Sequence, residues 1–159
     1  MPVFHYRLAT LLDQREGHKQ ECERTLAERK VERRRAQEEL TAFTQRQRSL
    51  EEATRDKRKA APVDATGDAW QDRASDIALL QQRVEAAKDD VFSQQLRIEE
   101  LEQRVAEAVE ALRLATREVE TLLKHRAEAE RKFREAGERK EALEQEEIAA
   151  AMYEKRRRA

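Results

Sequence analysis

The 159-residue sequence contains few of the residues that build a rounded core or a sharply folded loop. Aromatic residues make up 4 % of the chain, and there are only three glycines, two prolines and one tryptophan. Cys22 is the only cysteine, which excludes an internal disulfide bond and favours a reducing compartment. Because proline, glycine and serine, which are common in disordered chains, are scarce, the composition also argues against disorder.

Several kinds of functional site are missing as well. The sequence has no glycine-rich phosphate-binding loop, and nothing distinguishes a catalytic pair among its many carboxylates. His18 and Cys22 could share one helix face, but no third metal ligand is evident near them. No run approaches the roughly 18 apolar residues of a membrane span. We therefore expect a cytoplasmic protein with no enzymatic activity, no cofactor, no metal and no membrane insertion.

Charged residues, in contrast, make up 42 % of the sequence, and the formal net charge is −1. This balance argues against general nucleic-acid affinity. The basic runs RKVERRR (29–35) and KRRR (155–158) are interpreted as solvated or partner-facing helix surface. Residues 1–60 carry a net charge of +4 and residues 61–159 one of −5, so the two halves should attract each other.

The strongest pattern is a heptad repeat between residues 70 and 123, in which 13 of 14 core positions are apolar. The a positions are Ile77, Val84, Val91, Ile98, Val105, Leu112 and Val119. The d positions are Leu80, Ala87, Gln94, Leu101, Ala108, Ala115 and Leu122. Such a repeat predicts a long helix in a left-handed coiled coil. The three alanines at d indicate close helix approach.

The first half of the chain has a weaker stripe with the same alternating spacing of three and four residues. Its apolar members are Leu8, Leu12, Cys22, Leu26, Ala36, Leu40, Phe43 and Leu50. The stripe is interrupted by Arg15, Lys19, Arg29, Arg33 and Gln47. Long Arg and Lys stems can cover an apolar seam while their charged heads reach carboxylates. We therefore expect this helix to pack beside the acidic second helix.

A turn should separate the two helices, because residues 60–70 (AAPVDATGDAW) do not follow the helical pattern. Pro62 disfavours helical geometry at Ala61, so the first helix should end there. Asp68 followed by Gln71 resembles an N-terminal capping box for the second helix. The gap of about eight residues suits a short helix–helix connection. The predicted fold class is thus all-α: a long antiparallel two-helix coiled-coil hairpin with a longer C-terminal helix.

The expected elements of this single coiled-coil domain (1–159) are a first helix at about 3–60, a turn at 61–68 and a second helix at about 69–156. Around such a turn, paired residue numbers add up to about 130, which places Leu8 near Leu122. Residues 127–159 would then lack a partner in the first helix. A charged helix of this length is unlikely to be stable alone, which predicts a protein partner for this overhang.

Three features resemble the FliJ/YscO family, the stalk proteins of type III secretion ATPases. The start FHYRLATLLDQRE (4–16) is similar to the family's aromatic-plus-RLxxLLxxRE opening. The second feature is the unequal two-helix coiled coil. The charged tail ERKFREAGERKEALEQEEIAAAMYEKRRRA (130–159) looks like the end of these proteins. The resemblance covers the whole chain.

The resemblance implies a central stalk that promotes assembly and activity of a hexameric secretion ATPase and links it to the export gate. Substrate chaperones are further possible partners, and the protein itself would be a monomeric hairpin. The end that bears both termini would face the ATPase. The ATPase-facing candidates are Phe4, Leu8, Leu11, Leu12, Phe133, Arg134, Met152 and Tyr153.

The turn end would face the cytoplasmic ring of the export gate. The candidates carried over from the resemblance are Phe43, Leu50, Trp70, Ile77 and Leu80. Four of them already occupy the predicted seam and are better explained as core, whereas Trp70 lies where little of the first helix remains to cover it. Two other hypotheses stay open: a generic dimeric coiled-coil scaffold, and a nucleic-acid-associated helical protein suggested by the basic runs.

Overall fold

The computed structural model describes residues 3–60 and 66–158, and in these residues it contains two helices and no strand. Helix α1 runs from Ala9 to Lys59 and helix α2 from Gly67 to Arg158. The predicted all-α class is therefore confirmed, as is the prediction that the C-terminal helix is the longer one. Pro62 and most of the predicted turn at 61–68 lie outside the described residues.

The helix ends differ in detail from those expected. Helix α1 begins at Ala9 rather than near residue 3, and the segment before it lies against α2 through its aromatic side chains. At the start of α2, the backbone N–H of Ala69 donates to Thr66 Oγ1 at 3.4 Å. Thr66 is thus the N-cap, and the predicted capping box of Asp68 and Gln71 is wrong because both residues lie inside the helix.

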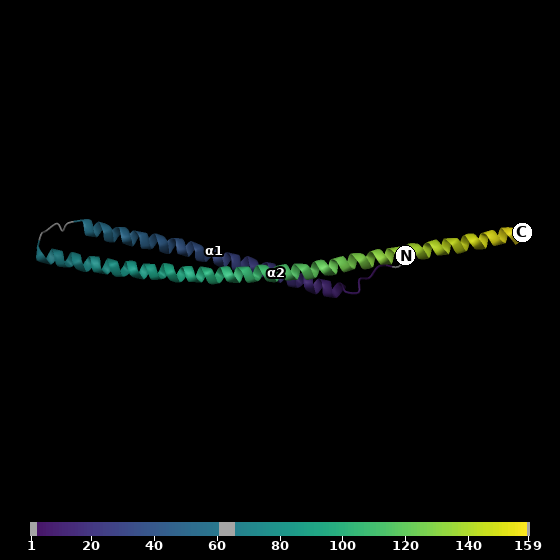
Figure 1. The fold of residues 1–159 in the computed structure, drawn as a ribbon, viewed down its shortest axis with the longest axis horizontal. Helices are drawn as coiled ribbons and strands as arrows, with labels where there is room; N and C mark the ends of the chain where they lie inside the picture. The colour runs from purple at the N-terminus through teal and green to yellow at the C-terminus, as the bar shows by residue number, and fades with distance from the viewer. Residues whose placement is uncertain (1–2, 61–65, 159) are drawn as a thin grey trace. The chain divides into compact units, whose positions relative to one another are not determined.

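The chain divides into two compact units, and each is described by itself. Unit 1 consists of Met1–Glu23 and Ala111–Ala159, and unit 2 of Arg24–Glu110. Within unit 2, α1 and α2 run antiparallel and side by side (Figure 1). Lys57 Nζ of α1 lies 2.7 Å from Asp76 Oδ2 of α2, and Gln94 of α2 contacts Ala36 and Glu39 of α1. Residue numbers that rise along α1 therefore meet falling numbers along α2.

The core of unit 2 lies along the predicted heptad. Ala36, 1 % exposed, packs with Ile98 and Leu101, and Leu40 lies against this cluster. Every predicted a and d position of α2, in both units, is buried or half-buried. Eight of the ten buried hydrophobic residues are predicted core positions of α2. Ala36 is the α1 member of this cluster, and its small side chain is compatible with close packing of the two helices.

Gln94 is the polar residue of the heptad, and the structure supplies its hydrogen-bond partners. Its Nε2 donates to Ala36 O at 2.8 Å and to Glu39 Oε2 at 2.9 Å. The side chain is buried, so both bonds offset the loss of contact with water. A buried polar group of this kind favours one register of the helix pair.

The predicted apolar stripe of α1 is also confirmed. One buried residue is added to it, and the expected direction of the ion pairs holds only in part. Thr54 is buried although it was not predicted; it lies seven residues after Gln47, and its hydroxyl donates to Leu50 O at 2.7 Å. Cations of α1 were expected to reach carboxylates of α2, and Lys57 does so with Asp76. In the ion pair of Arg97 with Glu39, however, α2 supplies the cation and α1 the carboxylate.

Unit 1 has a short antiparallel pairing of its own, between the start of α1 and α2. Leu12, Ala115 and Val119 are buried, and Arg15 Nη1 lies 3.0 Å from Glu118 Oε2. Tyr6 Oη donates to Leu122 O at 3.1 Å, two residues from the expected pairing of Leu8 with Leu122. From residue 131 to residue 158, every described residue of α2 is exposed.

Candidate partner-binding sites

The first candidate site is the N-terminal segment of unit 1 and the part of α2 that it touches. The Phe4 and Phe133 rings lie 5.6 Å apart between centroids, at an interplanar angle of 53°. Tyr6 Oη lies 3.0 Å from His125 Nδ1, and the two rings are 5.7 Å apart. The structure thus brings together Phe4 and Phe133, two predicted ATPase-facing residues that are far apart in the sequence.

The leucines predicted for the same site lie deeper. Leu8 and Leu11 are half-buried, and Leu12 is only 4 % exposed. Leu12 is held in the helix pair as a core residue, so it cannot contact a partner unless this packing opens. The aromatic residues before α1 are therefore better placed for binding than Leu12.

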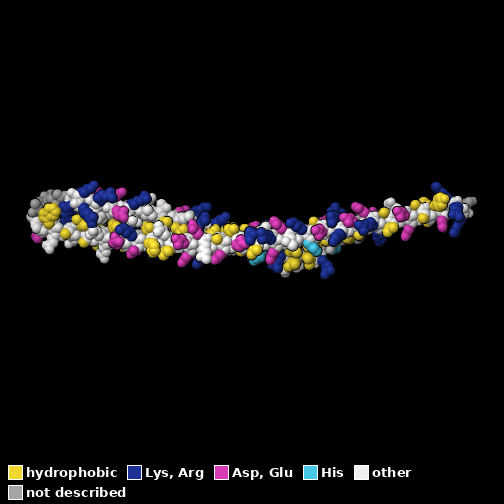
Figure 2. Space-filling view, in the orientation of Figure 1, with side chains coloured by type: hydrophobic (Ala, Val, Ile, Leu, Met, Phe, Trp, Pro, Cys, Tyr) yellow, Lys and Arg dark blue, Asp and Glu magenta, His cyan; other side chains and the backbone are white. Residues whose placement is uncertain are grey.

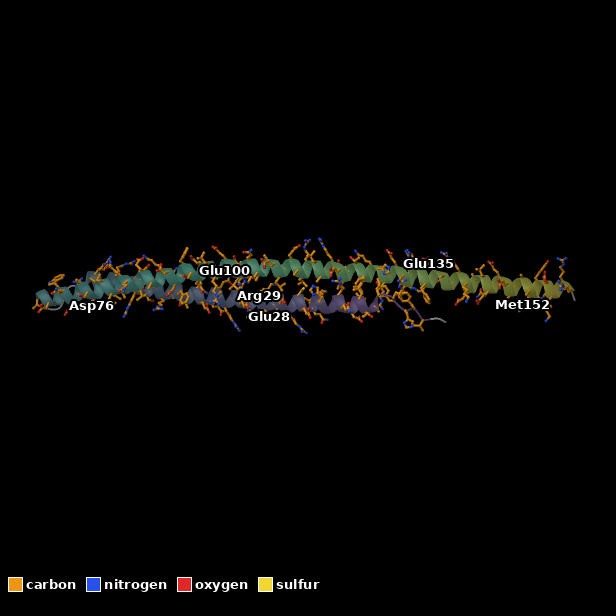
Figure 3. All side chains as sticks on the ribbon, turned by 90° about the horizontal axis from the view of Figure 1, so that it is seen from below. Glu28, Arg29, Asp76, Glu100, Glu135 and Met152 are labelled. Carbon is orange, nitrogen blue, oxygen red and sulfur yellow. The ribbon has the colours of Figure 1, made fainter. Side chains whose placement is uncertain are left out.

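The second part of this site is α2 from residue 131 onward. Its large apolar side chains are unusually exposed: Leu143 60 %, Ile148 57 %, Met152 64 % and Tyr153 70 %. Arg134 is exposed as well. A hollow of about 400 Å³ lies beside Phe133 and Gly137. Figure 3 shows Glu135 and Met152 on this part of α2, which carries its side chains outward.

Ion pairs along this segment join residues of the same helix. Arg131 and Arg139 both pair with Glu135, Lys140 pairs with Glu144, and Arg158 with Glu154, each at a spacing of four residues. Such pairs stabilise a helix by only about 0.3–0.5 kcal/mol each. They add a little to the stability of the helix without covering its apolar side chains.

The third candidate site lies where α1 ends and α2 begins, which we call the turn end of unit 2. Trp70 is 52 % exposed, and the Arg73 guanidinium carbon lies 5.4 Å from the centre of its ring. Arg73 Nη2 also donates to Arg58 O at 2.6 Å, in the last turn of α1. Yellow and dark blue side chains gather at this end in Figure 2.

The other predicted gate-facing residues are part of the seam. Phe43, Leu50, Ile77 and Leu80 are each half-buried between α1 and α2. Trp70 alone among the five is exposed, as its position at the start of the second helix indicated. Sequence analysis missed Arg73, although its place three residues after Trp70 on a helix is a usable signal.

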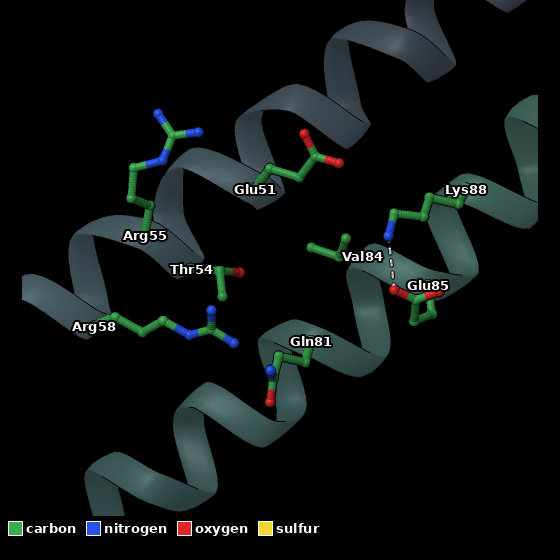
Figure 4. A pocket seen from close by; sticks show the side chains of 8 residues that line it. All are labelled: Glu51, Thr54, Arg55, Arg58, Gln81, Val84, Glu85 and Lys88. Atoms are coloured by element: carbon green, nitrogen blue, oxygen red, sulfur yellow. Dashed lines mark hydrogen bonds and ion pairs between the residues drawn. The ribbon is translucent and has the colours of Figure 1, made fainter.

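A polar groove of about 380 Å³ lies between α1 and α2 next to the turn end (Figure 4). Thr54 and Val84 are its buried residues, and Arg58 reaches between the helices toward Gln81. Lys88 Nζ donates to Glu85 Oε1 at 2.8 Å. The hydrogen bond and the charge of this carboxylate raise the pKa of Lys88, so the ammonium stays protonated.

A metal site and a membrane-spanning helix are both absent from residues 3–60 and 66–158. Cys22 Sγ and His18 Nε2 lie 3.8 Å apart, but no group of three or more His, Cys, Asp or Glu side chains there could hold a metal ion. Neither described helix has a stretch that is apolar enough to cross a membrane.

The family model of YscO-like proteins matches residues 3–159. The chain belongs to the YscO-like family. Membership relates it to type III secretion, in a family of secretion proteins with no known enzymatic activity, and it confirms the resemblance seen in the sequence. Comparisons with curated proteins and with solved structures gave no match.

Proposed function

We propose that this YscO-like protein is the central stalk of a type III secretion ATPase, which promotes assembly and activity of the hexamer and links it to the export gate. The observation that carries the proposal is the exposed C-terminal part of α2. Its large apolar side chains from Leu143 to Tyr153 are 57–70 % exposed, while the preceding part of the helix is paired.

Physical chemistry supports a partner for this segment. Large apolar side chains that stay exposed along one element mark interaction sites more often than scattered single residues do. Leu143, Ile148 and Met152 are spaced five and four residues apart, so they follow the helix over several turns. A helix that enters the central opening of a ring can bury such a surface on all sides.

The N-terminal segment would contribute to the same contact. Phe4 and Phe133 form one aromatic pair, which offers an apolar surface beside the exposed part of α2. We assign the ATPase contact to Phe4, Phe133, Arg134, Met152 and Tyr153, with Leu8 and Leu11 at its edge. Leu12 is left out because it is buried.

The turn end is proposed to face the cytoplasmic ring of the export gate, with Trp70 as its main contact. Handling of substrate chaperones is a further possible task of the exposed helix surfaces. In this arrangement the protein would work in the cytoplasm at the membrane-embedded secretion apparatus.

The test is stimulation of the cognate ATPase by the purified protein. The variant Met152→Ala/Tyr153→Ala should raise the concentration needed for half-maximal stimulation about ten-fold or more, since truncating interface side chains costs about 1–2 kcal/mol each. Phe92→Ala/Leu96→Ala is the matched control, because it removes two exposed apolar side chains from α2 in unit 2. Stimulation by the control should equal that of the unchanged protein.

Three outcomes would contradict the proposal. Stimulation that is insensitive to both the double variant and removal of residues 141–159 would exclude the C-terminal part of α2 from the contact. A stable dimer with no effect on the ATPase would favour a scaffold, and salt-dependent RNA or DNA binding would favour the nucleic-acid alternative.

A further inference from the structure

One side chain at the turn end of unit 2 makes two contacts that join the helices. The Arg73 guanidinium donates through Nη2 to Arg58 O at 2.6 Å, and its central carbon lies 5.4 Å from the centre of the Trp70 ring. The first contact reaches across to α1, and the second stays on α2. Arg73 therefore connects the end of one helix to an exposed aromatic residue at the start of the other.

The contact with α1 has a clear physical basis. The last four carbonyl groups of a helix lack partners within the helix, and the C-terminal end carries partial negative charge. Arg58 is the second-last residue of α1, so its carbonyl is one of these groups. A planar guanidinium has several donors in fixed directions and can bond this oxygen while one of its faces stays over an aromatic ring.

The contact with Trp70 affects how the indole is presented. A half-exposed tryptophan on the first turn of a helix can adopt several rotamers, and a partner must select one of them on binding. The guanidinium attracts the ring face and favours the rotamer in which the two groups lie together. The backbone amide N–H of Trp70 donates to Thr66 O at 3.2 Å, which holds the Trp70 backbone in the helix.

We propose that Arg73 is a positioning residue, which anchors α2 to the end of α1 and holds the Trp70 indole in one orientation for the partner at the turn end. The proposal rests on the proposed function, in which that partner is the cytoplasmic ring of the export gate. Trp70 makes the contact, and Arg73 acts through it.

The first experiment uses the free protein and does not depend on any partner. Trp70 is the only tryptophan, so its fluorescence reports this site alone. Arg73→Met should lower the fluorescence anisotropy and raise quenching by acrylamide, because the ring loses its cover. Arg83→Met removes the same charge from an exposed position of α2 and should change neither signal.

The second experiment measures binding of the full chain to the purified cytoplasmic domain of the export-gate protein. Arg73→Met should weaken binding about two- to five-fold, the loss expected for an exposed cation–aromatic contact. Arg73→Lys keeps the charge but lacks the planar guanidinium with its several donors. Its affinity should lie between those of Arg73→Met and the unchanged protein. Arg83→Met should bind like the unchanged protein.

A double-mutant cycle separates positioning from a direct or merely structural role. In a Trp70→Ala background, Arg73→Met should cause no further loss of affinity, because there is no indole to position. An equal loss in both backgrounds would overturn the proposal, as would unchanged anisotropy and quenching in the free Arg73→Met protein. If the unchanged protein does not bind the gate domain, the proposed gate contact fails, while the fluorescence result still decides whether Arg73 holds Trp70.

Discussion

Two regions of α2 have similar helix-forming residues but opposite surroundings. Between residues 77 and 122, every a and d position is buried or half-buried. Beyond residue 130, the same heptad continues with Phe133, Lys140 and Glu147 at a, and all of them are exposed. Charged residues at core positions resist burial because they lose contact with water. One continuous helix thus changes from a core-forming element to a partner-accessible one beyond the residues that pair with α1, and the charges of Lys140 and Glu147 suit that exposure.

The largest expected effect tests this difference directly. Leu101→Ala should destabilise the protein by about 2–3 kcal/mol, because the leucine is packed against Ala36 in the core of unit 2. The same truncation at Leu143, which is 60 % exposed, should change stability by about 0.5 kcal/mol or less. Urea denaturation followed by circular dichroism measures both. Equal costs would mean that the C-terminal part of α2 is packed in solution.

The difference can also be removed by design. Lys140→Ile/Glu147→Ile would extend the apolar a positions, and burying each new side chain would contribute up to about 1.5–3 kcal/mol. We expect this variant to self-associate through the C-terminal part of α2, as measured by sedimentation equilibrium.

The control for this design moves the same changes by one residue. Arg139→Ile/Glu146→Ile introduces equal apolar area outside the a and d positions and should associate less. Equal association of the two variants would show that general hydrophobicity, rather than the heptad pattern, drives it.

Within the paired region, substitution of the buried Gln94 should change stability in a way that depends on pH. Gln94→Glu places a carboxyl group beside the Glu39 carboxylate in a buried position, which raises the pKa of the new group in the folded state. A raised acid pKa means that the variant is nearly as stable as the parent at low pH. It loses about 1–3 kcal/mol as pH rises from the ordinary glutamate pKa toward the raised pKa. Thermal unfolding at pH 4 and pH 8 measures the change. Gln94→Leu is the control, and its stability relative to the parent should not depend on pH.

A smaller effect is expected where the paired region ends in unit 1. Tyr6→Phe removes the hydroxyl that bonds Leu122 O and His125. It should weaken the packing of the N-terminal segment against α2 by about 0.5–1 kcal/mol. Amide exchange of residues 3–8 should become faster. Exchange in the middle of α2 should stay unchanged, and a change there would mean that the segment supports the whole helix pair.

The smallest effect concerns a surface ion pair. Arg15 and Glu118 are both about half exposed, and such pairs contribute roughly 0–1 kcal/mol. Arg15→Gln should therefore lower stability by about 0.5 kcal/mol at low salt and by less at 1 M salt. An effect that persists at high salt would point to packing of the arginine stem.

Much of the fold followed from local chemistry in the sequence. The a and d positions from Ile77 to Leu122 were predicted correctly, because a repeat of seven residues specifies which helix face is buried. Thr54 was missed since a hydroxyl does not stand out in an apolar stripe, although its spacing from Gln47 continues it. Thr66 displaced Asp68 as the N-cap because several residues near the turn have side chains that can cap a helix.

For the candidate sites, the sequence correctly indicated that Trp70 would be exposed and that the end of the chain would have little cover. It could not show that Phe4 meets Phe133. The burial of Leu12 agrees with its predicted place in the apolar stripe of the first helix, although this helix begins at Ala9 rather than near residue 3.

By itself, the sequence determined the class of fold, the buried face of α2 and the point at which that face becomes charged. These are properties of neighbours three, four and seven residues apart, and helical geometry converts them directly into a surface. Only the tertiary structure decided that Arg73 reaches Arg58 O, that Tyr6 bonds Leu122 O and that the Phe4 ring lies against the tilted Phe133 ring. Each of these contacts joins residues of two different elements, so it depends on the register and side-chain directions that packing selects.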